Sequence, residues 1–156
     1  MNTLLLLVAL MFQGQVVVEG GPPPAPVPRD APSTLPDTPQ GKHVKAYIDA
    51  FNSGSAEAVA ALYAENATVE DPVGTPVRQG RAAILEFYRG TIATGARLAL
   101  DGPVRGSHGN AAAMAFTATI GPVTVRVIDV MTFDETGRFT SMKAYFAPDD
   151  ITQSDH

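Results

Sequence analysis

The stretch VTVRVIDVMTF, residues 123–133, alternates in a way that is typical of a β-strand with one face turned to a core. Its odd positions carry five apolar side chains and one carboxylate, that of Asp129. Because side chains alternate strictly along a strand, we expect Asp129 on the same face as its apolar neighbours. An ionised, unpaired carboxylate would be costly there, so we expect a raised pKa and a neutral carboxyl group that can donate a hydrogen bond.

Asp129 also has structural interpretations. It could pair with a cation or with backbone donors inside the core, or a β-bulge could turn it to solvent. Arg126 lies on the opposite face of the same predicted strand, which weakens a local ion pair. The pattern alone therefore leaves a structural and a functional role for Asp129 open.

The period of two continues on both sides of this stretch and predicts several strands in the C-terminal half. Short turn sequences at 121–122 (GP) and 135–137 (ETG) separate these strands and are typical of hairpins. The predicted strands are Ala96–Leu100, Ala111–Ile120, Val123–Phe133 and Phe139–Phe146.

The N-terminal half has helical spacing instead. Apolar residues recur at i, i+3, i+4 and i+7 from Val44 to Phe51, which predicts an amphipathic helix ending at 52–54 (NSG). Three helices followed by a strand-rich half predict an α+β domain, with the helices packed on a curved antiparallel sheet. The remaining predicted elements are a short helix capped by Ser55 with Val59, Leu62 and Tyr63 on one face, a strand at Ala67–Glu70, a turn at Asp71–Gly74, and a helix at Gly80–Arg89.

The composition excludes several classes of site. With 156 residues the chain has room for one domain of ordinary size, and its 17% of charged residues lies below the usual share of about 25%. A net charge of −5 with 11 Lys and Arg argues against binding to nucleic acid. The absence of cysteine excludes disulfides, thiolate metal sites and cysteine nucleophiles, and the three histidines lack metal-binding spacing.

The two ends of the chain differ from its middle. Leu4–Phe12 is an apolar run too short to span a membrane as a helix, and residues 22–39 contain eight of the 13 prolines. We therefore expect an extension at residues 1–37, a domain at residues 38–150 and a tail at residues 151–156. No Lys or Arg precedes the apolar run, so we expect a cytoplasmic protein without membrane contact; export is the alternative if residues 1–20 act as a signal peptide.

Four motifs together resemble the bacterial Δ5-3-ketosteroid isomerase family. They are Tyr47, the string ATVEDPVG that ends at Gly74, the string EFY that ends at Tyr88, and VIDVMTFDETGRFTSMKAYF around Asp129. The similarity runs from about Lys42 to Phe146. It implies the cone-shaped α+β fold of the nuclear-transport-factor-2-like superfamily, in which a curved mixed sheet and three helices enclose a deep apolar cavity, and it implies a homodimer.

The resemblance also implies roles for individual residues. Asp71 matches the general base, although Asp before Pro is on its own merely typical of a turn. Tyr47 and Asp129 match the two donors to the oxyanion, and Tyr88 and Tyr63 match tyrosines that extend the hydrogen-bond chain behind Tyr47; alone, the three tyrosines would be interpreted as core residues. The residues that match the cavity wall are Phe87, Met114, Phe116, Met142 and Phe146, the last replacing a tryptophan of some relatives.

The reaction implied is the conversion of a 3-oxo-Δ5-steroid into its Δ4 isomer by proton transfer from C4 to C6. It requires no metal or organic cofactor, and two aspartates with opposed pKa values are a known property of this enzyme class. Two alternatives remain open: a related cyclase, dehydratase or hydrolase acting on a polyketide or terpenoid, and a non-enzymatic binder of a hydrophobic small molecule.

Overall fold

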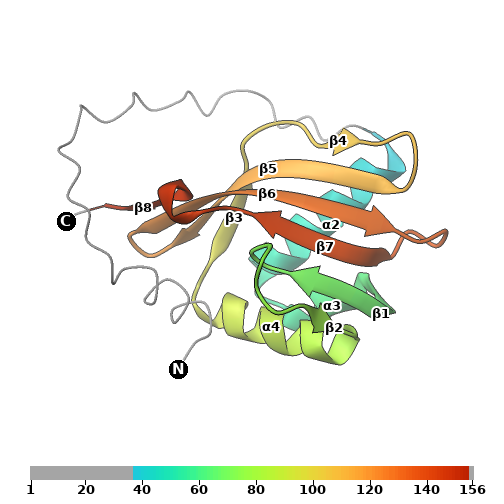
Figure 1. Ribbon diagram of the computed structural model, residues 1–156, viewed down its shortest axis with the longest axis horizontal. Helices are drawn as coiled ribbons and strands as arrows, with labels where there is room; N and C mark the ends of the chain where they lie inside the picture. The colour runs from blue at the N-terminus through green and yellow to red at the C-terminus, as the bar shows by residue number, and fades with distance from the viewer. Residues whose placement is uncertain (1–36, 155–156) are drawn as a thin grey trace.

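The computed structural model describes residues 37–154, and in this part of the chain three α-helices pack on one curved β-sheet (Figure 1). The predicted α+β class is confirmed. The helices are α2 (Pro39–Ser53), α3 (Ala56–Ala61) and α4 (Arg81–Ala93), and a short 3-10 helix, η1, covers Pro148–Asp150. The strands are β1 (Tyr63–Glu70), β2 (Arg78–Gln79), β3 (Arg97–Leu100), β4 (Arg105–Gly106), β5 (Ala111–Ile120), β6 (Val123–Phe133), β7 (Phe139–Tyr145) and β8 (Ile151–Gln153).

The sheet is mixed, because one of its strand pairs is parallel. Its order is β2-β1-β7-β6-β5-β3, with β4 also paired to β5 and β8 to β6. β1 and β7 run parallel, whereas the other pairs are antiparallel. This parallel pair brings the turn that follows β1 beside the end of β7, where the Val73 N–H donates to the Ala144 carbonyl at 2.8 Å.

β5 and β6 form the longest ladder of the sheet, with consecutive pairs from Ala111↔Thr132 to Ile120↔Val123. Side chains alternate along β6 as the sequence predicts: Val127 and Asp129 are buried, whereas Arg126 and Ile128 are exposed. No bulge interrupts the ladder between β5 and β6, so Asp129 points to the inner face toward the helices. The bulge interpretation of Asp129 is therefore wrong.

The first helix is anchored to the sheet at its C-terminal end. Gly54 ends α2 in the left-handed conformation (φ 84°), which glycine adopts without a steric penalty, and its N–H donates to the Phe51 carbonyl. Just before it, the Asn52 side chain accepts from the Leu98 N–H at 2.9 Å and donates to the Leu98 carbonyl at 2.8 Å. These two bonds fix the end of α2 against β3.

The second helix is shorter than the sequence predicts. Ser55 caps α3 as expected, since its hydroxyl accepts from the Ala58 N–H at 3.0 Å. However, Leu62 only caps the helix and Tyr63 is already the first residue of β1. The reason is the pairing with β7: the Phe139 N–H donates to the Leu62 carbonyl at 2.9 Å, and Tyr63 lies opposite Phe139.

The sequence analysis missed the two-residue strands β2 and β4, which are too short to show a period. It also ended the domain too early. Ile151–Gln153 of the predicted tail forms β8 and pairs with the start of β6, from Val125↔Ile151 to Val123↔Gln153. The predicted extension lies outside the described residues, apart from Asp37. Within the described part of the chain, no helix has the length and apolar character needed to cross a membrane.

Candidate active site

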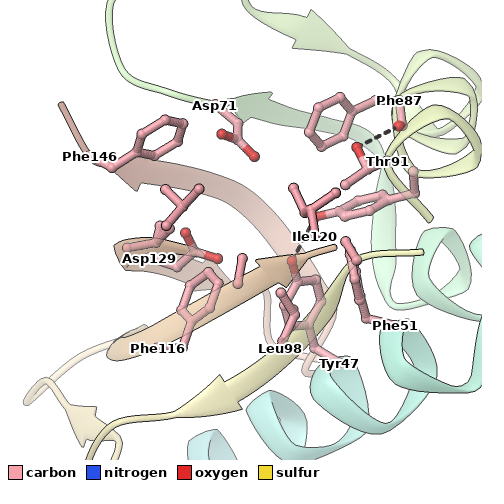
Figure 2. Close-up of a pocket in the computed structure, with 15 residues that line it drawn as sticks. Tyr47, Phe51, Asp71, Phe87, Thr91, Leu98, Phe116, Ile120, Asp129 and Phe146 are labelled. Atoms are coloured by element: carbon pink, nitrogen blue, oxygen red, sulfur yellow. Dashed lines mark hydrogen bonds between the residues drawn. The ribbon is translucent and has the colours of Figure 1, made fainter. Parts of the chain in front are cut away.

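A pocket lies between the inner face of the sheet and the helices α2 and α4 (Figure 2). Asp71, Asp129 and Tyr47 enter it from three different elements: the turn after β1, strand β6 and helix α2. The rest of the wall is almost entirely apolar and consists of Phe51, Phe87, Ala96, Leu98, Phe116, Ala118, Ile120, Val125, Val127 and Phe146, with Tyr88 and Thr91 as further polar residues. The structure thus brings the three main predicted site residues into one cavity.

Two of the predicted wall residues lie elsewhere. Phe87, Phe116 and Phe146 line the pocket, but Met114 and Met142 do not. Both methionines are almost fully buried in the core, where Met114 lies opposite Asp129 in the β5–β6 ladder. The inner face of the sheet is longer than the pocket. Helix α2 also packs against β5, the strand that carries Met114.

The sequence analysis also missed several wall residues. Val125 and Val127 lie on the same face of β6 as Asp129, so the alternation could have assigned them. Thr91 lies one helical turn after Phe87, and its hydroxyl donates to the Phe87 carbonyl at 3.0 Å. Phe51 and Leu98 meet in the pocket only because α2 packs beside β3, which no local signal in the sequence predicts.

The three buried tyrosines form a directed hydrogen-bond chain. Tyr63 and Tyr88 are joined by a bond of 2.7 Å between their hydroxyl oxygens, and the Tyr88 hydroxyl donates to that of Tyr47 at 3.3 Å. Each phenol has one proton. Since Tyr88 donates its only hydroxyl proton to Tyr47, the Tyr63 hydroxyl must donate to Tyr88. Tyr47 therefore accepts within the chain and keeps its own proton for an acceptor in the pocket.

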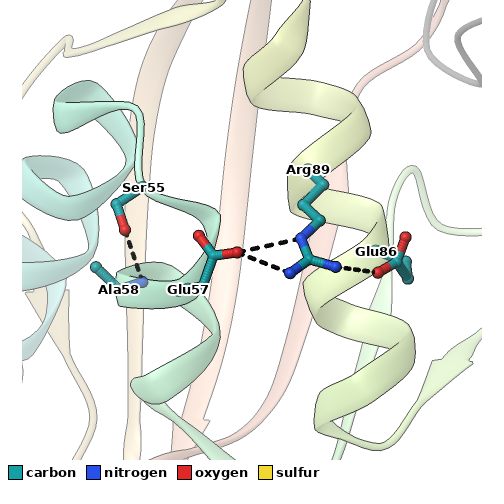
Figure 3. Close-up of polar contacts among 5 residues, drawn as sticks. All are labelled: Ser55, Glu57, Ala58, Glu86 and Arg89. Atoms are coloured by element: carbon teal, nitrogen blue, oxygen red, sulfur yellow. Dashed lines mark hydrogen bonds and ion pairs between the residues drawn. The ribbon is translucent and has the colours of Figure 1, made fainter.

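Salt bridges on the surface hold the helix that carries Tyr88 in place. Arg89 follows Tyr88 in α4 and reaches Glu57 of α3 at 2.8 Å as well as Glu86 of its own helix at 2.6 Å (Figure 3). Such exposed pairs contribute about 0–1 kcal/mol each, and only the pair with Glu57 joins α4 to another element. The core contacts of Tyr88 with Phe51 of α2 and Tyr63 of β1 supply the main restraint.

Apart from the tyrosines, Asp129 is the only buried polar or charged side chain among residues 37–154. Its side chain is 1% exposed, and Oδ1 has no hydrogen-bond partner among the described residues. Burial raises the pKa of Asp129 well above the ordinary value, and the charge of Asp71 raises it further. Burial therefore favours the neutral carboxylic acid, which has a proton to donate.

Asp71 has a different environment from Asp129, although both line the same cavity. Its side chain is partly exposed in the turn, and burial raises its pKa to about 6 while the positive charge of Arg78 acts in the opposite direction. Asp71 is thus mostly ionised at neutral pH yet close to the pH at which it holds a proton. Its charge also disfavours ionisation of Asp129, so the two groups remain in opposite protonation states.

The arrangement can accept a proton at one place and stabilise negative charge at another. The Asp71 carboxylate is a base, whereas the Asp129 carboxyl and the Tyr47 phenol are donors set in a largely apolar wall, where such donors act strongly on a developing oxyanion. The described residues contain no group of three or more His, Asp or Glu side chains that could hold a metal ion. The chemistry available to these side chains is proton transfer on an apolar molecule.

Comparison with known proteins identifies the fold and close relatives. A family model for the SnoaL-like domain matches residues 44–142. A steroid Δ-isomerase of Nocardioides simplex is 48% identical over 112 residues, which cover 69% of this chain and 89% of that protein. In a solved structure, the epoxide hydrolase/cyclase-like enzyme SalBIII, described for pyran ring formation in the polyether salinomycin, matches with a TM-score of 0.70 at 30% identity, over 74% of this chain and 95% of that one.

The buried Asp129 carboxyl should make stability depend on pH. Because its folded-state pKa is raised, its favourable contribution is complete below about pH 4, the unfolded value, and is lost as the pH rises toward the folded value. The Asp129→Asn variant cannot ionise. We therefore expect its free energy of unfolding, relative to the wild type, to increase by up to about 1.4 kcal/mol per pH unit above pH 4.

Urea unfolding at several pH values between about 4 and 8 measures this difference. The exposed Asp149→Asn substitution is the matched control, and its difference from the wild type should stay flat over the same range. A flat difference for Asp129→Asn as well would contradict a neutral buried carboxyl.

Proposed function

The chain belongs to the SnoaL-like domain family, and within that family we propose that it is a steroid Δ-isomerase, converting 3-oxo-Δ5-steroids into 3-oxo-Δ4-steroids. One observation carries the proposal: Asp71, Asp129 and Tyr47 line the same apolar pocket, and Tyr47 does not use its own proton within the tyrosine chain. Burial raises the pKa of Asp129 well above its ordinary value and that of Asp71 only to about 6, which favours opposite protonation states for the two carboxyl groups. The relative named a steroid Δ-isomerase, with 48% identity over most of its length, supports the same assignment.

The first step is removal of a proton from C4 of the steroid. The Asp71 carboxylate takes this proton, the C4–H electron pair forms a C3=C4 double bond, and the carbonyl electrons move to O3. The product is a dienolate with its negative charge on O3. An ionised base with a pKa of about 6 can accept the proton and still release it in the next step.

The negative charge on O3 is stabilised by the Tyr47 phenol and the Asp129 carboxyl, both of which donate a hydrogen bond to it. Tyr63 and Tyr88 support Tyr47, because the hydrogen bond that it accepts increases its own strength as a donor. Removing one such donor typically costs about 2.7–4 kcal/mol of barrier in enzymes. The apolar wall excludes water and thereby strengthens these bonds.

In the second step the protonated Asp71 delivers its proton to C6. The π electrons of the C5=C6 double bond form the new C6–H bond, and those of the C3=C4 double bond form the C4=C5 double bond. The carbonyl at C3 is restored, and Asp71 returns to its ionised state. The proton therefore stays within one substrate molecule, and the sequence of steps requires no metal or organic cofactor. Phe87, Phe116 and Phe146 would contact the steroid rings as part of the wall.

A related cyclase or hydrolase is the second candidate, because the structural relative SalBIII is described as epoxide hydrolase/cyclase-like. An acid and a base in one pocket could also open an epoxide. The isomerase proposal is favoured by the higher identity of the isomerase relative and by the oxyanion donors, which suit a carbonyl oxygen. A non-enzymatic binder would have no use for an unpartnered carboxyl in an apolar wall.

We propose in addition that the protein is a homodimer joined through the outer face of its sheet. In Figure 1, β5, β6 and β7 pass in front of α2, on the face of the sheet away from that helix. Ile128 and Tyr145 lie opposite one another on β6 and β7 and are 50% and 47% exposed. Large exposed apolar side chains that neighbour each other are typical of an interface, and a second copy offers the same surface in return.

Replacing the base should abolish turnover without abolishing binding. With 5-androstene-3,17-dione, growth of the conjugated enone absorbance measures the reaction, and we expect wild-type kcat/KM to rise with pH through about 6 as Asp71 ionises. For Asp71→Asn we expect kcat to fall by about three orders of magnitude or more, with the Kd of an enone steroid changed less than about tenfold. An equal loss of binding would contradict the role of Asp71 as base. Absence of turnover in the wild type, with tight steroid binding, would indicate a binder or a different reaction.

Removing either oxyanion donor should slow the chemistry. Tyr47→Phe and Asp129→Leu should each lower kcat by about 10²–10³-fold, with smaller changes in KM, because these bonds strengthen in the transition state. Thr91→Val is a matched control from the same wall, since the Thr91 hydroxyl is already bonded to a backbone carbonyl. Unchanged rates in both donor variants would contradict the assignment of Tyr47 and Asp129.

A charge on the outer face should separate the proposed dimer. We expect the wild type to sediment as a dimer and Ile128→Asp to sediment as a monomer in analytical ultracentrifugation, because an aspartate buried in an apolar interface is costly. Ala58→Asp places the same charge on exposed helix α3 and should leave the dimer intact. A monomeric wild type at micromolar concentration would overturn this proposal.

A further inference from the structure

Arg78 is a positively charged residue that the sheet register turns toward the inside of the protein. It lies opposite Val69 in the β1–β2 pair, and directly opposed residues of an antiparallel pair point to the same face. Val69 is fully buried, so Arg78 is directed to the inner face of the sheet as well. This places a cation near the apolar wall that contains Asp71 and Phe87.

The guanidinium group of Arg78 is held there by an aromatic ring rather than by a carboxylate contact. Its central carbon lies 4.2 Å from the centre of the Phe87 ring, within the range of a cation–π interaction. Nη1 is buried and has no hydrogen-bond partner among residues 37–154, and none of the salt bridges in this part of the chain includes Arg78. Arg81 of the same segment differs, since it binds the Tyr63 carbonyl and Glu65.

A guanidinium with a buried nitrogen and no bonded anion is costly, so its position needs a compensating interaction. The Phe87 ring supplies part of it, and Phe87 lines the pocket together with Asp71. Of the groups that interact electrostatically with Asp71, Asp129 of β6 and the tyrosines Tyr47 and Tyr63 are neutral at neutral pH. The remaining group is Arg78 of β2, whose positive charge is opposite to that of the Asp71 carboxylate.

We propose that Arg78 is a positioning residue for the general base: held over the Phe87 ring beside the pocket, its guanidinium favours the ionised form of the Asp71 carboxylate. This inference rests on the proposed role of Asp71 as base. Arg78 does not line the pocket, so it acts on the substrate only through Asp71. Without this charge, the pKa of Asp71 would be higher, and a smaller fraction of the protein would carry the carboxylate that accepts the C4 proton.

The test is the pH dependence of kcat/KM in Arg78→Gln. We expect the midpoint of the acidic limb to shift to a pH about one unit higher, with the value of kcat/KM on the high-pH plateau retained within about threefold. Arg78→Lys keeps the charge and should leave the limb closer to that of the wild type. The exposed Arg105→Gln substitution is the control and should change neither limb nor plateau.

A merely structural role would give a different result. A lowered plateau with an unmoved acidic limb in Arg78→Gln would overturn the proposal, and so would an unchanged profile. Phe87→Leu provides a second variant that retains the arginine: with the guanidinium released from the ring, the limb should again move upward. An unmoved limb in that variant would contradict the part assigned to Phe87.

A direct titration separates this inference from the proposed function. The carboxyl carbon of Asp71 can be followed by ¹³C NMR in protein labelled at aspartate, with its signal assigned by its loss in Asp71→Asn. We expect a pKa of about 6 in the wild type and a higher value in Arg78→Gln. Equal values would overturn the inference even in an active isomerase, whereas a shifted value would support it even if the steroid were not turned over.

Discussion

The ladder between β5 and β6 is the constraint on which the rest of the site depends. Its consecutive pairs leave no freedom to rotate a side chain from one face to the other, so every odd residue of β6 faces inward. A single carboxyl, Asp129, is thereby fixed in an apolar wall. This burial raises the pKa of Asp129, and the neutral carboxyl that it favours is the form that the proposed function requires as a hydrogen-bond donor.

The two aspartates of the pocket show how position in the fold decides chemical behaviour. Asp129 belongs to a central strand and has no contact with solvent, whereas Asp71 lies in a turn at the margin of the sheet. Burial raises the pKa of Asp129 well above its ordinary value, whereas the pKa of Asp71 is raised only to about 6. The charge of Asp71 reinforces the difference, since it opposes ionisation of Asp129.

Periodicity predicted most of the fold because the responsible forces are local or repeat along the chain. The bounds of β5 and β6, the end of α2 at Gly54 and the cap at Ser55 all follow from such signals. The placement of Tyr63 was wrong because pairing with β7 overrides a helical spacing. Short strands such as β2 have no period at all, and only the tertiary structure reveals their register.

The site was predictable to a similar extent. Asp129 was conspicuous as a carboxyl within an apolar pattern, but Asp71 and the tyrosines gained roles only through resemblance to a family. The direction of the tyrosine chain and the position of Arg78 depend on distances between segments far apart in sequence. No sequence pattern predicts them. Conversely, Met114 and Met142, which the resemblance assigned to the wall, do not line the pocket, because the inner face of a strand is longer than the cavity that it borders.

The solitary carboxyl of β6 also has an evolutionary consequence. An apolar residue at position 129 would suit the surrounding wall better, so selection for stability alone acts against aspartate there. Under the proposed function, the aspartate is retained for turnover rather than for stability. In relatives that keep the fold without this reaction, we expect position 129 to become apolar before the aromatic core changes.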